Sequence, residues 1–148
     1  MLDAPSERVW ASIVTMEGVN HELGPYLRMT LPREARHKTI DDVPLGRVAF
    51  HSWILLGGVV PMDRHALKLV ELTPGVGFLE QSTSWLQRAW RHERRLTPVA
   101  PGRTRIVDRL VPEPRIASIA PLARRLVGAI FRHRHRRLHA AFGGSFEG

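Results

Sequence analysis

One long amphipathic segment near the end of the chain constrains the fold more than any other feature. Across residues 116–141 the apolar side chains recur every three or four positions, and Gly143-Gly144 follow them. This spacing predicts a C-terminal helix of roughly 26 residues, about 39 Å long at 1.5 Å per residue. The arginines of the segment project away from the apolar stripe, which indicates a helix that buries one face only.

The chain before this helix has the pattern of two short helices followed by about six strands. Residues 5–14 and 16–23 have helical spacing, and Gly24-Pro25 ends the second helix. Residues 32–46 are polar and predict a loop. The expected strands are residues 26–31, 47–56, 65–72, 76–85, 87–99 and 104–111, with Gly57-Gly58 breaking or bending the second and Pro112 and Pro114 closing the β region.

These segments predict an α+β fold in which a curved antiparallel sheet wraps around the C-terminal helix. Strands that follow one another through short turns pair antiparallel, and such a sheet has one apolar face to cover. Only the C-terminal helix is long enough to cover that face. A single helix does not fill the hollow of a curved sheet, so we expect a cavity between the two.

Length and composition fit one globular domain spanning residues 1–148, with 43% hydrophobic and 24% charged residues. The chain has no cysteine, which excludes disulfides, thiolate nucleophiles and cysteine metal sites. No apolar run is long enough to cross a membrane, and residues 1–10 lack the features of a secretory signal. We therefore expect no membrane span and a cytoplasmic location.

Positive charge is concentrated in the last part of the chain. The formal net charge is +8, and residues 86–148 contain 14 arginines against Glu93, Asp108, Glu113 and Glu147. A basic face of this kind attracts nucleic acid, anionic lipid or an acidic partner. Arginine also outnumbers lysine 20 to 2 over the whole chain, which points to general residue usage, so we expect no specific nucleic-acid binding.

Five pieces of sequence, taken in order, resemble a known superfamily. They are residues 4–11, 78–81, 90–93, 104–108 and 130–138, which read APSERVWA, FLEQ, WRHE, TRIVD and IFRHRHRRL. Their order and spacing resemble the START-like, or SRPBCC, superfamily, which has the helix-grip fold and includes lipid-transfer domains and polyketide cyclases and dehydratases. The resemblance implies a cavity for a hydrophobic molecule, with or without catalysis.

One departure from that superfamily concerns the sheet edge. Members place a strand before the first helix, whereas only residues 1–4 precede Pro5 here. Either the usual first strand is shortened, or the true start lies upstream, or another chain supplies this edge of the sheet. An unpaired edge invites pairing with another chain, so a homodimer through the open edge is a further expectation.

Three strands are expected to send polar side chains to the same face as apolar ones. Alternation places Phe78, Glu80 and Ser82 together, then Trp90, His92 and Arg94, then Ile106, Asp108 and Leu110. If all three sets face inward, the polar members converge beside the cavity. Such a cluster has two interpretations. A histidine between two carboxylates can act as a general acid, with His92, Glu80 and Asp108 as the catalytic candidates. Alternatively, the cluster is a buried polar network that pairs its own charges.

The candidate ligand-binding residues come from these strands, from the second strand and from the C-terminal helix. In the second strand either His51 or Ser52 must face the cavity, and among Trp10, Trp53, Trp85 and Trp90 we expect one or two to line it. The candidates are Phe50, Ser52, Phe78, Glu80, Trp90, His92, Arg94, Asp108, Leu126, Val127 and Ile130.

Other chemistries have weaker support. His135 and His139 have the spacing of a helical metal pair but lie among arginines, which repel a cation. Residues 75–77 (GVG) lack the following helix that a phosphate loop needs, and no serine lies in a nucleophile elbow. We expect no metal and no cofactor.

Three functions remain open at this point. The first is binding or transport of a small hydrophobic molecule in the cavity. The second is a cyclase or dehydratase type of enzyme that uses the acid–base residues of the same cavity. The third is an interaction protein whose basic C-terminal helix binds nucleic acid, an anionic membrane or an acidic partner.

Overall fold

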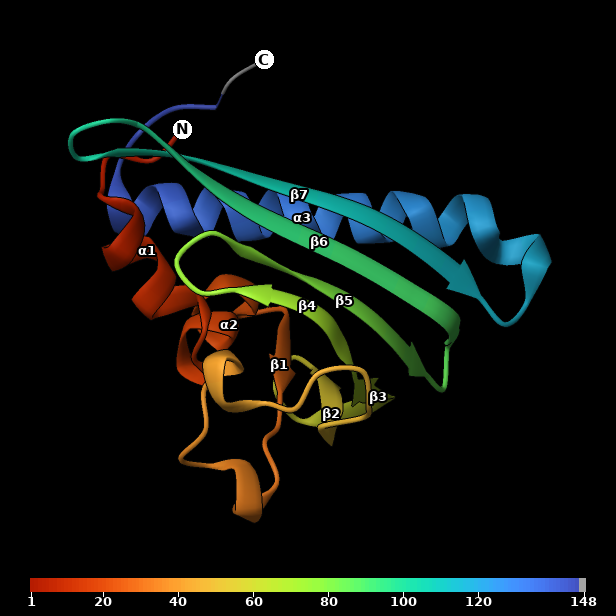
Figure 1. Cartoon of the computed structure of the whole chain (residues 1–148). Helices are drawn as coiled ribbons and strands as arrows, with labels where there is room; N and C mark the ends of the chain where they lie inside the picture. Colours follow the sequence, from red (N-terminus) through yellow and green to blue (C-terminus); the bar gives the residue numbers. More distant parts are fainter. Residues whose placement is uncertain (147–148) are drawn as a thin grey trace.

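The protein is described by a computed structural model that covers residues 1–146, and it has the predicted α+β architecture (Figure 1). Two short helices open the chain, strands occupy its middle, and one long helix closes it. The elements are α1 (Ser6–Ile13), α2 (Met16–Leu23), β1 (Leu27–Met29), β2 (Phe50–Leu56), β3 (Val60–Leu67), β4 (Leu69–Thr73), β5 (Gly77–Ser84), β6 (Gln87–Ala100), β7 (Arg103–Pro114) and α3 (Ala120–Phe142), with 3-10 turns at Arg33–Ala35, Ile40–Asp42 and Ala117–Ile119.

All strand pairs of the sheet are antiparallel. The strand order is β1-β2-β3-β5-β6-β7, and β4 lies beside the first half of β5. In Figure 1 the helix α3 runs along β6 and β7, whereas β1, β2 and β3 curl away toward the opposite side. This confirms the helix-grip arrangement, a curved antiparallel sheet closed by a long C-terminal helix.

The predicted strand at residues 65–72 is wrong. Gly57 and Gly58 both have positive φ, at 60° and 80°, so they break the strand and turn the chain into a hairpin. As a result β3 begins at Val60. It ends at Leu67, because the backbone N–H of Lys68 donates to the side-chain oxygen of Ser82 on β5 instead of to a backbone carbonyl, and β4 continues beyond this break. The sheet therefore has seven strands.

The predicted end of the last strand at residue 111 is also wrong, although Pro114 does close the β region as predicted. β7 continues through Pro112 to Pro114, and Pro112 lies opposite Trp90 of β6. Within the sheet β7 pairs with β6 alone, so it is an edge strand, and a proline there removes no hydrogen bond that the sheet needs.

The helix boundaries follow local capping chemistry. Pro5 precedes α1, and Thr15 starts α2 by accepting a hydrogen bond from the N–H of Gly18 on its side-chain oxygen. The C-terminal helix begins at Ala120 rather than at residue 116, because residues 117–119 form a 3-10 turn.

The expected shortened first strand is a single antiparallel bridge between Leu2 and Thr104 of β7. The two backbone hydrogen bonds of this bridge are 2.8 and 3.0 Å long. The hydroxyl of Thr104 also donates to the carbonyl of Ala4, and both Leu2 and Thr104 are fully buried. The bridge thus fixes the segment that leads into α1.

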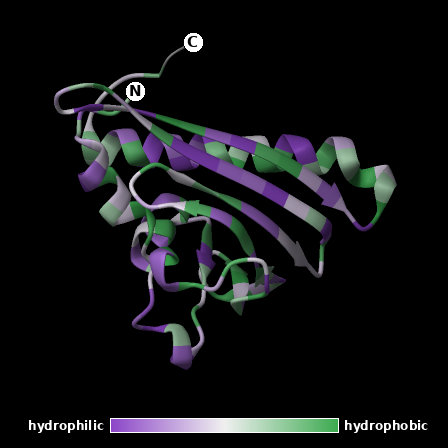
Figure 2. Ribbon diagram, in the orientation of Figure 1, coloured by the Kyte–Doolittle hydropathy of each residue, from purple (hydrophilic) through white to green (hydrophobic). Residues whose placement is uncertain are grey.

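The hydrophobic core fills one end of the space between the sheet and α3. It joins α1 to the C-terminal half of α3 and to the near ends of the strands, and includes Val9, Trp10, Ile13, Leu69, Phe78, Leu96, Ile106 and Leu138. The first half of α3 is richer in apolar residues than the second (Figure 2), yet it takes no part in this core. Among the described residues no helix is long and apolar enough to cross a membrane.

Candidate functional site

A cavity of about 370 Å³ lies at the other end, between the concave face of the sheet and the first half of α3. Ligand pockets in proteins have volumes of roughly 300–1,000 Å³, so this cavity is large enough for a small molecule. Its walls are mostly apolar and come from nearly every element. Val19 of α2, Ile54 of β2 and Val127 of α3 are representative wall residues.

Most of the predicted ligand-binding residues line this cavity. They are Phe50, Phe78, Glu80, Trp90, His92, Arg94, Leu126, Val127 and Ile130.

Two predicted residues, Ser52 and Asp108, do not belong to the lining. Ser52 is fully buried, and its hydroxyl has no hydrogen-bond partner among the described residues. Asp108 lies behind Arg94, with which it forms two hydrogen bonds. Ser52 is opposite His65 in the β2–β3 pair, so its side chain points to the concave side of the sheet but lies beneath the wall.

The four tryptophans occupy different environments. Trp90 lines the cavity, and Trp10 belongs to the core. Trp53 and Trp85 pack edge to face at 5.0 Å between ring centroids, and Trp85 is 60% exposed. One tryptophan therefore contributes to the cavity wall.

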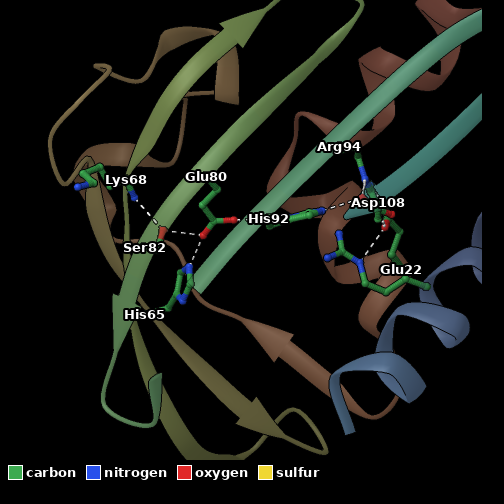
Figure 3. Close-up of polar contacts among 9 residues, drawn as sticks. Glu22, His65, Lys68, Glu80, Ser82, His92, Arg94 and Asp108 are labelled. Atoms are coloured by element: carbon green, nitrogen blue, oxygen red, sulfur yellow. Dashed lines mark hydrogen bonds and ion pairs between the residues drawn. The ribbon is translucent and has the colours of Figure 1, made fainter. Parts of the chain in front are cut away.

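Glu80 is the centre of the first polar cluster at the cavity (Figure 3). Its Oε1 accepts hydrogen bonds from His65 Nε2 at 2.5 Å and from the Ser82 hydroxyl at 2.7 Å. Its Oε2 lies 3.6 Å from Nδ1 of His92, on the next strand. Because Glu80 and His92 are register partners in the β5–β6 pair, their side chains point to the same face.

Arg94 is the centre of the second cluster, and it bridges two carboxylates. Its guanidinium donates to Asp108 at 2.7 and 2.8 Å and to Glu22 of α2 at 3.0 and 3.1 Å. Glu22 also accepts from Nε of Arg134 of α3 at 2.9 Å, and Asp108 accepts from His135 at 2.7 Å. These contacts connect α2, β6, β7 and α3 beside the cavity.

Burial and opposite charges set the ionisation of both clusters. Burial alone would raise the pKa of Glu80, but the charge and hydrogen bond of His65 outweigh it and hold the pKa of Glu80 far below its ordinary value. Burial would likewise raise the pKa of Asp108, but the charge of Arg94 outweighs burial and keeps this pKa well below its usual range. Burial lowers the pKa of His65, but the adjacent Glu80 charge outweighs burial and raises it.

His92 connects the two clusters. Its Nε2 lies 2.7 Å from Asp108 Oδ1, and since a carboxylate only accepts, this nitrogen carries the proton. The ring packs edge-on against Phe78 and Phe131, with centroids 5.2 and 5.0 Å apart. The predicted convergence of Glu80, His92 and Asp108 is thus present, and the charges pair with one another. A catalytic role for these residues stays a prediction.

Four members of the clusters were not predicted from the sequence: Glu22, His65, Arg134 and His135, the last of which was considered only as a metal ligand. His65 is the first residue of the predicted strand 65–72 and shares a face with Leu67, so alternation along this strand was a usable signal. Glu22 follows Val19 by three residues on α2, so its position on the apolar side of that helix was a usable signal. Arg134 lies four residues after Ile130 and four before Leu138, so its position on the apolar stripe of α3 was a usable signal.

The histidines of α3 make contacts that do not resemble a metal site. His135 Nε2 bonds to Asp108, and His139 Nε2 bonds to the carbonyl of Met1 at 3.1 Å. Within residues 1–146 no cluster of three or more histidine or carboxylate residues could hold a metal ion.

Comparison with known families gives a match over almost the whole chain. A model of the family described as domain of unknown function DUF8410 matches residues 1–142. The chain belongs to DUF8410. No curated protein matches this DUF8410 chain.

Two solved structures are similar to the DUF8410 chain in fold. Protein CV1439 from Chromobacterium violaceum superposes with a TM-score of 0.69 at 16% identity, over 98% of this chain and 94% of that one. DynU16, from the dynemicin biosynthetic locus, has a TM-score of 0.59 at 15% identity, over 98% of this chain and 47% of its own length. At these identities the likeness concerns the fold.

Proposed function

We propose that the protein binds a small hydrophobic molecule in the cavity between the sheet and the first half of α3. The observation that carries the proposal is the cavity itself, about 370 Å³ of space with mostly apolar walls. Apolar ligand surface buried there would contribute roughly 25 cal/mol per Å² to binding.

The polar cluster around Glu80 would orient the ligand. Glu80 and His92 both line the cavity. Oε2 of Glu80 and Nδ1 of His92 lie 3.6 Å apart, too far for a hydrogen bond, and neither atom has another hydrogen-bond partner among the described residues. Oε2 of Glu80 is a carboxylate acceptor, so it favours a ligand whose polar end is a donor such as a hydroxyl group.

The fold supports this proposal as well. The helix-grip arrangement, the likeness to DynU16 and the order of sequence pieces described above all favour membership in the START-like superfamily. That resemblance implies a hydrophobic ligand, and we propose the superfamily membership together with the function.

A pair of substitutions on α3 tests the proposal. Ala123 lines the cavity, whereas Ala129 lies on the exposed face of the same helix. We expect the wild-type protein to bind the uncharged dye N-phenyl-1-naphthylamine with an increase in fluorescence. Ala123→Phe should weaken binding at least tenfold by filling the cavity, and Ala129→Phe should leave it unchanged. Equal binding by both variants, or none by the wild type, would refute the proposal.

A further inference from the structure

The entrance of the cavity is apolar. Five residues that line the cavity are also substantially exposed at its opening: Met62 at 40%, Leu86 at 47%, Ile119 at 41%, Leu122 at 55% and Leu126 at 55%. Scattered exposed apolar residues are ordinary, but a contiguous group around an opening indicates an interaction surface.

The same end of the molecule carries two larger exposed apolar side chains. Trp85, in the turn between β5 and β6, is 60% exposed, and Ile116, just before the first turn of α3, is 63% exposed. The N–H of Arg115 donates to the carbonyl of Leu86, which holds the two segments together. In Figure 1 the β5–β6 turn and the start of α3 lie at the same end of the molecule.

A row of arginines borders this apolar entrance. Arg125, Arg132 and Arg136 are exposed and follow one another at spacings of seven and four, which places them on one face of α3 next to the Leu122 and Leu126 stripe. Within residues 1–146 none of the three has an ion-pair partner. The sequence has no acidic residue from 114 to 146, so their charge is not offset locally.

We propose that the face formed by Met62, Leu86, Ile119, Leu122, Leu126 and the arginines Arg125, Arg132 and Arg136 rests on an anionic lipid bilayer. The charge of the row is complementary to anionic headgroups, and the apolar rim enters the acyl boundary, as in interfacial amphipathic helices. A nucleic acid would use the arginines but would leave the apolar rim in water. An anionic bilayer pairs with the arginines and also buries the apolar rim.

Docking in this orientation places the cavity opening against the bilayer. A hydrophobic ligand then moves between lipid and cavity without crossing water. This step rests on the proposed function, whereas the docking itself depends only on the surface.

Vesicle sedimentation tests the docking. The wild-type protein should sediment with phosphatidylcholine vesicles that contain phosphatidylglycerol, sediment poorly with pure phosphatidylcholine vesicles, and dissociate as salt is raised. The variant Arg125→Gln/Arg132→Gln/Arg136→Gln should bind about a hundredfold more weakly, at about fivefold for each arginine near the surface. Leu122→Gln/Leu126→Gln should weaken binding at unchanged charge.

A matched control uses three arginines that are also exposed but lie on other parts of the molecule, in the variant Arg28→Gln/Arg47→Gln/Arg91→Gln. It removes the same charge and should bind vesicles nearly as the wild type does. Equal losses of vesicle binding in both triple variants would show that binding depends only on net charge, and would overturn the proposal. The proposal would also be overturned if the wild-type protein did not sediment with the vesicles, or if it bound homopolymeric RNA and not the vesicles.

N-phenyl-1-naphthylamine binding separates this proposal from the proposed function. The Arg125→Gln/Arg132→Gln/Arg136→Gln variant should keep wild-type dye binding, because its substitutions lie outside the cavity wall. Vesicle binding without dye binding would refute the hydrophobic ligand but leave the docking face intact. Dye binding without vesicle binding would refute the docking alone.

Discussion

Replacing Glu22 by glutamine should destabilise the protein strongly, although the two side chains have the same size. Glu22 is 1% exposed and accepts three hydrogen bonds, two from Arg94 and one from Arg134. A glutamine amide turns one of these acceptors into a donor and leaves the two buried guanidinium groups with less compensating charge. Breaking a buried ion pair from one side costs about 3–5 kcal/mol. For a chain of this length that corresponds to a melting temperature lower by about 6–20 °C.

Thermal and urea unfolding of Glu22→Gln and Glu113→Gln provide the measurement. Glu113 forms an ion pair with Arg88 in which both side chains are largely exposed, so its loss should cost less than about 1 kcal/mol. The pKa of Glu22 is lowered from its ordinary value of 4.5 in the folded protein, because the two arginines outweigh the effect of burial. The Glu22 carboxylate therefore stabilises the folded protein fully above pH 4.5. This contribution is lost as the pH falls through the lower pKa of Glu22 in the folded state. The difference in the free energy of unfolding between the wild type and Glu22→Gln should narrow in that acid range. Similar losses in the two variants would refute this reasoning.

Three further predictions concern the cavity side of the sheet. The pKa of His65 is raised above 6.5 by Glu80, so its stabilisation is complete below pH 6.5 and is lost as the pH rises through the folded-state pKa. The stability difference between wild type and His65→Gln should thus shrink with rising pH in urea unfolding, and a difference that grows would contradict the assignment. Ser82→Ala should cost about 1–3 kcal/mol, because it removes a hydrogen bond to Glu80 and leaves the Lys68 N–H unpaired. Ser52→Ala should leave stability unchanged or raise it by up to about 1 kcal/mol, since the hydroxyl it removes has no partner among the described residues. A larger loss at Ser52 than at Ser82 in urea unfolding would show that this account of the two hydroxyls is wrong.

Local periodicity predicted the features of the fold that depend on neighbouring residues. The helical repeat identified α3, and alternation along β5, β6 and β7 predicted that Glu80, His92 and Asp108 share one face of the sheet. Antiparallel register then brings them together, because Glu80 lies opposite His92 and Arg94 lies opposite Asp108. Side-chain alternation and short turns were sufficient for this part of the site.

The remaining features depend on contacts between elements distant in the sequence. Glu22 reaches Arg94 across 72 positions and Arg134 across 112. No local pattern marks such a partner. The break at Lys68 was also missed, because it follows from the hydroxyl of Ser82 replacing a sheet hydrogen bond. The course of β7 through Pro112 was missed because edge position is a property of the assembled sheet.

Methyl NMR of the protein with N-phenyl-1-naphthylamine tests the existence of an apolar binding site most directly. Val127 and Ile130 line the cavity, whereas Val107 and Val111 are exposed on the convex face of the sheet, at 39% and 47%. We predict intermolecular nuclear Overhauser effects from the dye to the methyl groups of Val127 and Ile130, with none to Val107 or Val111. Effects confined to the convex-face valines, or no effects at saturating dye, would contradict the account.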